Sequence, residues 1–337
     1  MDQMRATQIF MNTFTRLIAT VMFAWIAVLP IGVAVAADYP VKSIRILVGF
    51  APGGSADIIA RAVGQKLGDA FKQPVVVDNR SGALGIIAAD LAAKANPDGY
   101  TLFEATMATH GIGPNLYKKL PYDVVNDFEA VALMVRIPLV MFVHGSVPAE
   151  NLKEFVVLTK SNPGTYSYAS AGAGSPPHLV AELLKLKTGA QVLHVPYKGT
   201  GAALPDLVAG RQVHMMIDGP PPFIPYVKSG RLRALAAASE KRNPLLPDVP
   251  TFAELGVTGM EAGLWYGIVA PKGTPKAVVT RLNVEINHAL EQSDLRERFA
   301  AMSVEIVGGQ PEAFARYIKS ELKRWGEVVR AAHIKVE

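Results

Sequence analysis

The sequence contains no cysteine, so neither a disulfide framework nor thiolate chemistry supports its fold or function. It also lacks the patterns of several common active sites. GxSxG, HExxH and GxxxxGKS/T do not occur, and neither of the two glycine-rich segments completes GxGxxG with a downstream acidic residue. These absences argue against an α/β-hydrolase, a zinc peptidase and a nucleotide-binding protein.

Patterns for metal and nucleic acid binding are missing as well. The seven histidines are scattered singly, with no pair at metal-ligand spacing. His110 and His178 lie near predicted loops, whereas His194 and His214 fall in strand patterns that are typical of buried histidines. Basic residues exceed acidic ones only by 34 to 29, and no basic tract has interleaved aromatics. We therefore expect no metal, no cofactor and no nucleic acid partner.

Only one long segment is both free of charge and mostly apolar. Residues 17–37 are mostly apolar and end in GVAVAADYP, where small residues fit the cleavage rule of secretory signal peptides. We predict a signal peptide over 1–37 and an exported, periplasmic mature protein. An uncleaved membrane anchor is the alternative, because about 20 apolar residues can span a bilayer. Pro30 and Gly32 interrupt the run and favour the signal peptide.

The mature sequence begins with alternating strand and helix patterns. Strands are predicted over 43–50, 75–79 and 101–107, and helices over 56–71 and 85–95. The order βαβαβ predicts a mostly parallel sheet covered by helices.

The same order restarts after residue 145. The predicted strands and helices alternate over 165–170, 175–188, 191–197, 203–210, 213–218 and 231–239. Ser175 at the N-cap, Pro176 at the first helical position and Gly189 at the end delimit one of these helices. The chain therefore contains two similar α/β units.

The C-terminal part adds a strand over 264–271 and three helices, the last with a wide apolar stripe from Phe314 to Val329. Such a stripe must cover a core, so we expect the chain to return to the first unit. Two crossovers, near 140 and 258, then form a hinge. We predict domain 1 from 38–142 plus 258–337, and domain 2 from 143–257.

Two glycine-rich turns, FAPGGSAD and SAGAGSPPH, each follow a strand and open a helix. Backbone N–H groups at a helix N-terminus are unpaired and carry partial positive charge, so each turn suits an anion. One turn in each unit would grip a carboxylate from two sides. The alternative is that both are ordinary tight turns, and phosphate is a rival anion.

Two aspartates accompany these turns. Asp57 lies in the first turn of a helix, where a carboxylate stabilises the helix dipole, and direct ligand contact is its alternative role. Asp218 ends a strand at the edge where open α/β sheets bind ligands, so it is a candidate partner for an amino or hydroxyl group. A capping or hinge role is the alternative for Asp218.

The order of several segments resembles one known family. The segments are YPVKSIRILVGFAPGGSADIIAR, VVVDNRSGALG, ANPDGYTL, LPYDVVNDF, SAGAGSPPHLVAEL, HVPYKGTGAALPDLVAGRQV and LPDVPTFAELG. Over the whole mature chain they resemble the tripartite tricarboxylate transporter receptors, also called the Bordetella uptake gene family. The resemblance implies an α/β type II periplasmic binding protein fold, with two doubly wound domains joined by crossing strands around a ligand cleft. It also implies binding of di- or tricarboxylates, acidic amino acids or aromatic carboxylates, largely through backbone amides and waters.

Carried over to this chain, the resemblance adds the loops 106–110 and 197–199 to the two glycine turns and Asp218. The predicted ligand-binding residues are Phe50, Ala51, Pro52, Gly53, Gly54, Ser55, Asp57, Thr106, Thr109, His110, Ser170, Ala171, Gly172, Gly174, Ser175, Tyr197, Gly199 and Asp218. The chain departs from many relatives at Gly49 and Ala51, which would widen the pocket, and at the prolines 220–222, which would stiffen one wall.

We expect a monomeric solute-binding protein that closes on a small carboxylate and delivers it to the membrane permease subunits of a tripartite tricarboxylate transporter. We expect no catalytic residue. The alternatives are a receptor that presents its closed form to a membrane sensor, and a periplasmic enzyme acting on a carboxylate.

Overall fold

The computed structural model describes residues 39–335, and the expected signal peptide over 1–37 lies outside the described residues. The chain from Pro40 onward forms one compact unit. No helix within the described part has the length and apolarity needed to cross a bilayer.

A six-stranded sheet organises the first lobe, a name used here for this sheet and the helices packed on it. The strand order is β11-β4-β10-β3-β1-β2. The strands are β1 (Ile44–Val48), β2 (Val75–Asn79), β3 (Thr101–Thr106), β4 (Phe128–Pro138), β10 (Gly263–Pro271) and β11 (Glu305–Ile306). β1, β2 and β3 are parallel, but β10 runs antiparallel to both β3 and β4. The sheet is therefore mixed rather than mostly parallel, because β4 leaves this lobe and β10 returns to it in the opposite direction.

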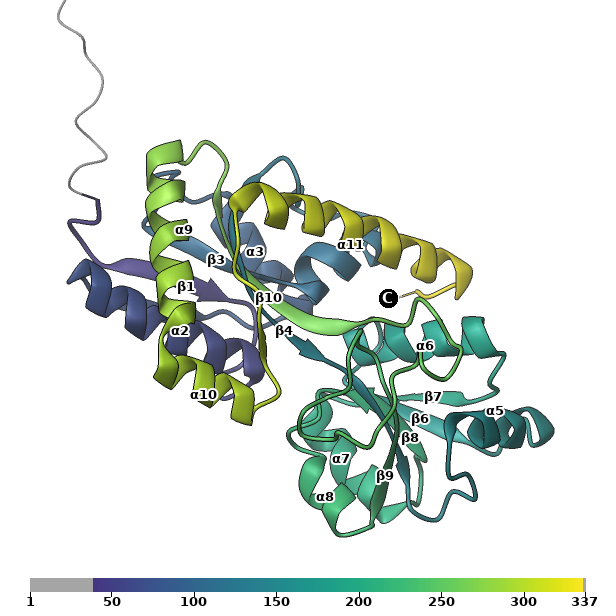
Figure 1. The fold of residues 1–337 in the computed structure, drawn as a ribbon. Helices are drawn as coiled ribbons and strands as arrows, with labels where there is room; N and C mark the ends of the chain where they lie inside the picture. Colours follow the sequence, from purple (N-terminus) through teal and green to yellow (C-terminus); the bar gives the residue numbers. More distant parts are fainter. Residues whose placement is uncertain (1–38, 336–337) are drawn as a thin grey trace, which may run out of the picture. The chain divides into compact units, whose positions relative to one another are not determined.

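Helices cover this sheet, and Figure 1 shows α9 beside α2. The helical segments are α2 (Ser55–Phe71), η1 (Ala83–Gly85), α3 (Ile86–Ala93), η2 (Met107–Ile112), α4 (Gly113–Leu116), α9 (Lys276–Glu291), α10 (Ser293–Ala301) and α11 (Pro311–Ala331). The apolar stripe of α11 is buried at Phe314, Ile318, Trp325 and Val329, and α11 packs against β4 and η2. In this structure the chain returns to the first sheet with β10, β11 and α11.

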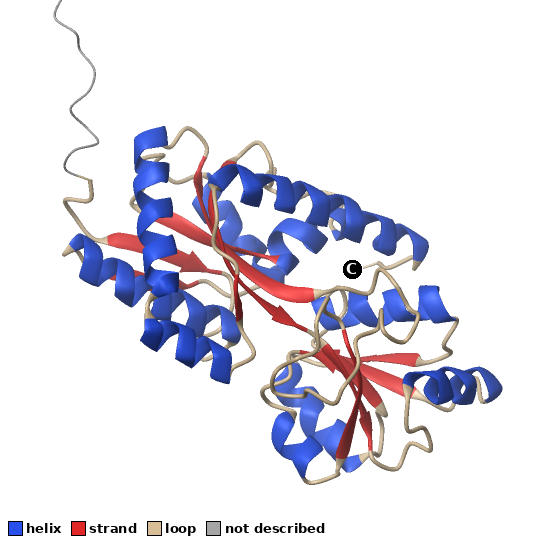
Figure 2. Ribbon diagram, viewed as in Figure 1, coloured by secondary structure: helices blue, strands red, loops and turns tan. Residues whose placement is uncertain are grey.

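A five-stranded sheet organises the second lobe, in the order β7-β6-β8-β5-β9. Its strands are β5 (Val140–His144), β6 (Ser167–Ser170), β7 (Leu193–Pro196), β8 (Met215–Asp218) and β9 (Leu232–Ala237). Its helices are α5 (Leu152–Ser161), α6 (Pro176–Thr188), α7 (Thr200–Ala209) and α8 (Ile224–Lys228), and Figure 2 shows them around the strands. β6 is parallel to β7 and β8, while β5 is antiparallel to β8 and β9.

Two chain crossings join the lobes. Only Leu139 separates β4 from β5, close to the predicted crossover near 140, and the return runs from Ala238 to Ala262. The Leu139 N–H donates to Ala262 O at 3.1 Å, Ala238 N–H donates to Leu139 O at 2.8 Å, and Ala262 N–H donates to Ala238 O at 2.8 Å. The crossing segments are thus hydrogen-bonded to one another. The division into two domains at 142/143 and 257/258 stays a prediction.

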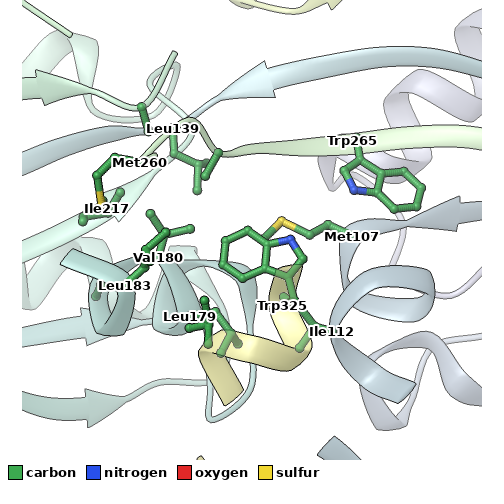
Figure 3. Close-up of a cluster of buried hydrophobic side chains, with 14 of the residues drawn as sticks. Met107, Ile112, Leu139, Leu179, Val180, Leu183, Ile217, Met260, Trp265 and Trp325 are labelled. Carbon is green, nitrogen blue, oxygen red and sulfur yellow. The ribbon is translucent and has the colours of Figure 1, made fainter. Parts of the chain in front are cut away.

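One apolar cluster runs through both lobes beside these crossings. Figure 3 shows Met107 and Trp265 of the first lobe with Leu179 and Val180 of α6, and Trp325 of α11 among them. All five side chains are at least 99% buried. Burial of this shared apolar surface stabilises the contact between α6 and the first lobe in this structure.

Candidate ligand-binding site

The first glycine turn, between β1 and α2, is held by a network of polar side chains. Gly53 N–H donates to Asp57 Oδ2 at 3.0 Å, and Arg61 Nε donates to Asp57 Oδ1 at 2.9 Å. Arg61 also donates to Asn79 Oδ1, and the Asn79 amide donates to Phe50 O. Burial opposes ionisation of Asp57, but these hydrogen bonds outweigh it and lower its pKa. In this structure Asp57 holds the turn, which supports its structural role.

The tip of the same turn faces solvent. Ala51 to Gly54 are exposed and Ser55 is half-buried. Gly53 has φ +84°, and a Cβ there would meet no atom within 4 Å, so the backbone conformation rather than space requires glycine. Among the described residues, the N–H groups of Gly54 and Ser55 have no acceptor, as expected for the first turn of a helix. These amides are available to an anion.

Gly49 is required by a close approach of two backbones. A Cβ at Gly49 would lie 2.6 Å from Gly85 Cα, and a Cβ at Gly85 would lie 2.7 Å from the methyl group of Thr109. Gly49 therefore lets the β1 end, the loop before α3 and η2 pack together. It does not widen a pocket, which corrects the interpretation made from the sequence.

The second glycine turn, between β6 and α6, satisfies most of its own polar groups. Gly172 N–H donates to Ser170 Oγ at 3.1 Å, and Ser175 N–H donates to Gly172 O at 3.1 Å. Gly174 N–H donates to His178 Nδ1 at 2.9 Å, and the Ser175 hydroxyl donates to Gly172 O at 2.7 Å. Ser175 is the N-cap and Pro176 the first helical residue, as predicted. The amides of Gly172 and Gly174 thus have internal acceptors in this structure.

Asp218 lies at the end of β8 with both carboxylate oxygens engaged. The Thr200 hydroxyl donates to Oδ2 at 2.5 Å, and Gly219 N–H donates to Oδ1 at 2.8 Å. Thr200 opens α7 directly after Gly199, whose φ is +102°. The side chain is buried, and burial raises the pKa of Asp218 to about 6. A buried carboxyl group with a displaced pKa at a strand end is typical of a functional position.

Tyr197 connects the loop after β7 to the second glycine turn. Its N–H donates to Ser170 O at 3.1 Å, and its hydroxyl donates to Asp206 Oδ2 at 2.7 Å. Burial together with the neighbouring Asp206 carboxylate raises the pKa of Tyr197 to about 12. Tyr197 therefore serves as a neutral hydrogen-bonding group at ordinary pH.

The loop 106–110 belongs mainly to the core. Thr106 caps η2 through a reciprocal pair of hydrogen bonds with Thr109. His110 is fully buried, stacked against Phe103 and Tyr122, and its Nδ1 lies 3.0 Å from Thr109 Oγ1. Burial lowers the pKa of His110 to about 3. In this structure His110 does not face solvent, and Thr109 is also fully buried.

Tyr266 of β10 is a buried residue that sequence reasoning missed. It pairs with Thr106 of β3 in the first sheet. Burial raises the pKa of Tyr266, and the nearby carboxyl groups of Glu104 and Asp218 raise it further. The side chain of Ser55 lowers this pKa, so polar groups from the start of α2 and from the end of β8 both act on Tyr266.

Glu104 of β3 was missed as well. It is fully buried, and neither carboxyl oxygen has a hydrogen-bond partner in the described part of the chain. Burial raises the pKa of Glu104 well above its usual value, and the Asp57 carboxylate adds to this effect. The signal was available in the sequence, because Glu104 is an acidic residue inside an otherwise apolar strand.

Residues for a metal site do not assemble in the described residues, where no group of three His, Asp or Glu side chains lies within reach of one ion. A cavity of about 730 Å³ lies beside the crossing segments, with charged residues such as Arg136, Lys241, Glu261 and Arg324 in its wall. None of the predicted ligand-binding residues lines this cavity.

Comparison with known proteins agrees with the resemblance in the sequence. The model of the tripartite tricarboxylate transporter family receptors matches residues 59–334. The chain belongs to this family. Among family relatives, BugT of Bordetella pertussis is 39% identical over 325 residues, which cover 96% of this chain and 99% of BugT.

Solved structures of the family share the fold. R. palustris Rpa4515, solved with adipate, is 35% identical to this chain with a TM-score of 0.79. The match covers 88% of this chain and 99% of the Rpa4515 chain. MatC from Rhodopseudomonas palustris, solved with bound malate, is 35% identical to this chain with a TM-score of 0.76. The match covers 86% of this chain and 100% of the MatC chain. The predicted periplasmic binding protein fold is confirmed, with mixed sheets in both lobes.

Proposed function

We propose that this family receptor binds a small carboxylate between the first glycine turn and the end of β8. The observation that carries the proposal is the exposed first glycine turn, where the amides of Gly54 and Ser55 have no acceptor among the described residues. We include the end of β8 because Asp218 and Ser55 both affect the pKa of Tyr266. An exposed helix N-terminus with unpaired amides at Gly54 and Ser55 attracts a carboxylate without any arginine or metal. The relatives solved with adipate and malate support a dicarboxylate.

The unpaired amides supply part of the affinity that a carboxylate ligand needs. A hydrogen bond to a charged group contributes about 1.5–3 kcal/mol. Gly54 and Ser55 supply two such bonds, and about two to four more from other groups and bridging waters would bring the dissociation constant into the micromolar range, which corresponds to about 8 kcal/mol. Interaction energy beyond this value is needed to offset the entropy that is lost when the ligand and the loops become ordered.

The second lobe contributes selectivity. Asp218 would accept hydrogen bonds from an amino or hydroxyl group, or donate one when protonated, because its pKa of about 6 lies near ambient pH. The ligand classes that fit are dicarboxylates, tricarboxylates, acidic amino acids and aromatic carboxylates. Capture involves no chemical change, so the protein is a receptor and not an enzyme.

Delivery completes the function. Ligand contacts to both lobes favour a closed arrangement by differential binding, and rotation takes place at the crossing segments around Leu139. We propose that the protein acts in the periplasm after removal of residues 1–37, and that the permease of a tripartite tricarboxylate transporter recognises its closed form.

Calorimetry of the purified mature protein tests this function with mono-, di- and tricarboxylates, glutamate and benzoate. We expect micromolar binding of at least one di- or tricarboxylate, compaction on small-angle scattering, and recovery of the unchanged ligand by mass spectrometry. Absence of binding across the panel would refute the carboxylate class, and conversion of the ligand would identify an enzyme. Asp248 is exposed, so Asp248→Asn is the control for Asp218→Asn.

A further inference from the structure

The second glycine turn depends on a histidine that accepts a backbone hydrogen bond. His178 is the third residue of α6, and its Nδ1 accepts the N–H of Gly174, the residue before the N-cap Ser175, at 2.9 Å. Glutamine or glutamate usually performs this backward capping of a helix start. A histidine can accept here only when Nδ1 carries no proton, so the contact requires the neutral ring.

A second histidine supports the other end of the same turn. His194 of β7 lies with Nε2 2.7 Å from Ser170 Oγ. Ser170 Oγ accepts Gly172 N–H at 3.1 Å and lies 3.0 Å from Gly172 O. The two imidazole rings stack on each other, with centroids 3.9 Å apart and an angle of 7° between their planes. The turn is therefore tied at both ends to one pair of stacked rings.

The surroundings keep this pair neutral. Burial lowers the pKa of His178, and burial together with the neighbouring His178 lowers the pKa of His194 to about 4. The charged groups that face the pair are Glu182, which raises both pKa values, and Lys185, which lowers them. These two side chains form an ion pair at 2.7 Å, and the Tyr168 hydroxyl donates to Glu182 at 2.6 Å, so the carboxylate charge is largely compensated.

We propose that His178 and His194 are positioning residues, which hold the second glycine turn in its ligand-ready shape while neutral and release it when protonated. Protonation of His178 places an N–H against the N–H of Gly174, and the hydrogen bond is lost. Protonation of His194 places a positive charge 3.9 Å from the second ring and favours separation of the stack. Only the expected effect on ligand affinity rests on the proposed function.

Nuclear magnetic resonance of the full mature protein tests the positioning role without a ligand. We expect the Gly174 amide resonance to shift with the same midpoint as the His178 ring between pH 7.5 and 4, and this midpoint to lie below 6.5. A His178 ring that titrates without any response at Gly174 would overturn the proposal. A Gly174 amide that shifts with an ordinary histidine midpoint would also overturn it.

Affinity for adipate and malate, measured by calorimetry between pH 7.5 and 3.5, tests the consequence for binding. His178→Gln keeps an acceptor for Gly174 N–H but does not titrate, so it should match the natural protein at pH 7.5. It should bind more tightly than the natural protein at low pH, by about tenfold per pH unit below the pKa of the pair. His178→Phe keeps the stack but removes the acceptor, so it should bind weakly throughout.

His214 provides the matched control. It accepts the N–H of Ser167 through Nδ1 at 3.2 Å, on the same sheet but outside the glycine turn. His214→Gln should follow the natural protein at every pH, because titration of the ligand affects all variants alike. A constant affinity ratio between His178→Gln and the natural protein would refute the release on protonation. If neither ligand binds any variant at pH 7.5, adipate and malate are not its ligands and the panel described above decides the ligand class, while the resonance experiment still decides the positioning role.

Discussion

Asp218 offers a quantitative test of a buried ionisable group at the proposed site. The rise of its pKa from 3.8 to about 6 on folding corresponds to about 3 kcal/mol. Below pH 3.8 the carboxyl group is protonated in both the folded and the unfolded chain, so its ionisation does not lower the free energy of unfolding. As the pH rises from 3.8 to 6 the unfolded chain releases its proton first, and the free energy of unfolding falls by this amount. Above pH 6 the loss is complete.

The variant Asp218→Asn removes this pH dependence with little change in shape. Its amide can donate to the Thr200 hydroxyl and accept from Gly219 N–H, so both observed hydrogen bonds have replacements. We expect the variant to exceed the natural protein in free energy of unfolding by up to about 3 kcal/mol at pH 7.5. At pH 3.5 the difference should vanish.

Urea denaturation followed by tryptophan fluorescence at several pH values measures this difference. Asp248→Asn changes an exposed aspartate by the same chemistry, so its curves should coincide with those of the natural protein at every pH. A stability gain from Asp218→Asn that is equal at pH 3.5 and 7.5 would contradict the reasoning, because it would not come from ionisation. The expected result would mean that the natural sequence retains a destabilising carboxylate at the proposed ligand site.

Three further predictions concern groups around the site. Glu104→Gln should unfold at a higher urea concentration than the natural protein at pH 8 but not at pH 4. The reason is that the raised pKa of buried Glu104 makes the free energy of unfolding fall as the pH rises above 4.5. Equal shifts of the urea midpoint at both pH values would argue against this cause. Gly49→Ala should lower the free energy of unfolding by about 1–3 kcal/mol in urea titrations, since its Cβ would lie 2.6 Å from a backbone atom, and unchanged stability would show that the two backbones separate easily. Glu321→Ala should lower the free energy of unfolding by about 2–5 kcal/mol in the same assay, because Glu321 Oε2 accepts two buried indole N–H groups at 2.9 Å. Glu321→Gln keeps an acceptor and should lower the free energy of unfolding less. Equal losses in the two variants would rule out the hydrogen bonds as the cause.

Local patterns were sufficient to predict much of the fold. The strand at 75–79 and the helix that starts at Pro176 and ends before Gly189 agree with the structure, because turn and capping residues mark their ends. β5 was not predicted, and its direction depends on pairing with β8 and β9, which are distant in sequence. The mixed order of both sheets follows from such long-range pairing, for which a local pattern gives no signal.

Site residues could be predicted where a glycine-rich turn marks them in the sequence. They could not be predicted where residues from distant parts of the chain are brought together by the fold. The glycine turns lie at helix starts as expected, but the acceptors of their amides are Asp57 and His178, whose side chains fold back on the turns. Tyr266 has no special signal in the sequence, and only the return of β10 places it opposite Thr106 of β3. The ligand-binding roles of the predicted residues stay predictions.

The position of β10 has a consequence for the order in which the chain folds during synthesis. β10 is the fifth strand of the first lobe in chain order and is made only after the whole second lobe, yet it lies between β3 and β4 in the sheet. A nascent chain that ends before Gly263 therefore exposes the edges of both strands, while β5 to β9 are already complete. Until the ribosome has passed residue 271, the second lobe can form its sheet but the first cannot. The first lobe, although it begins the chain, is therefore the last to complete its sheet.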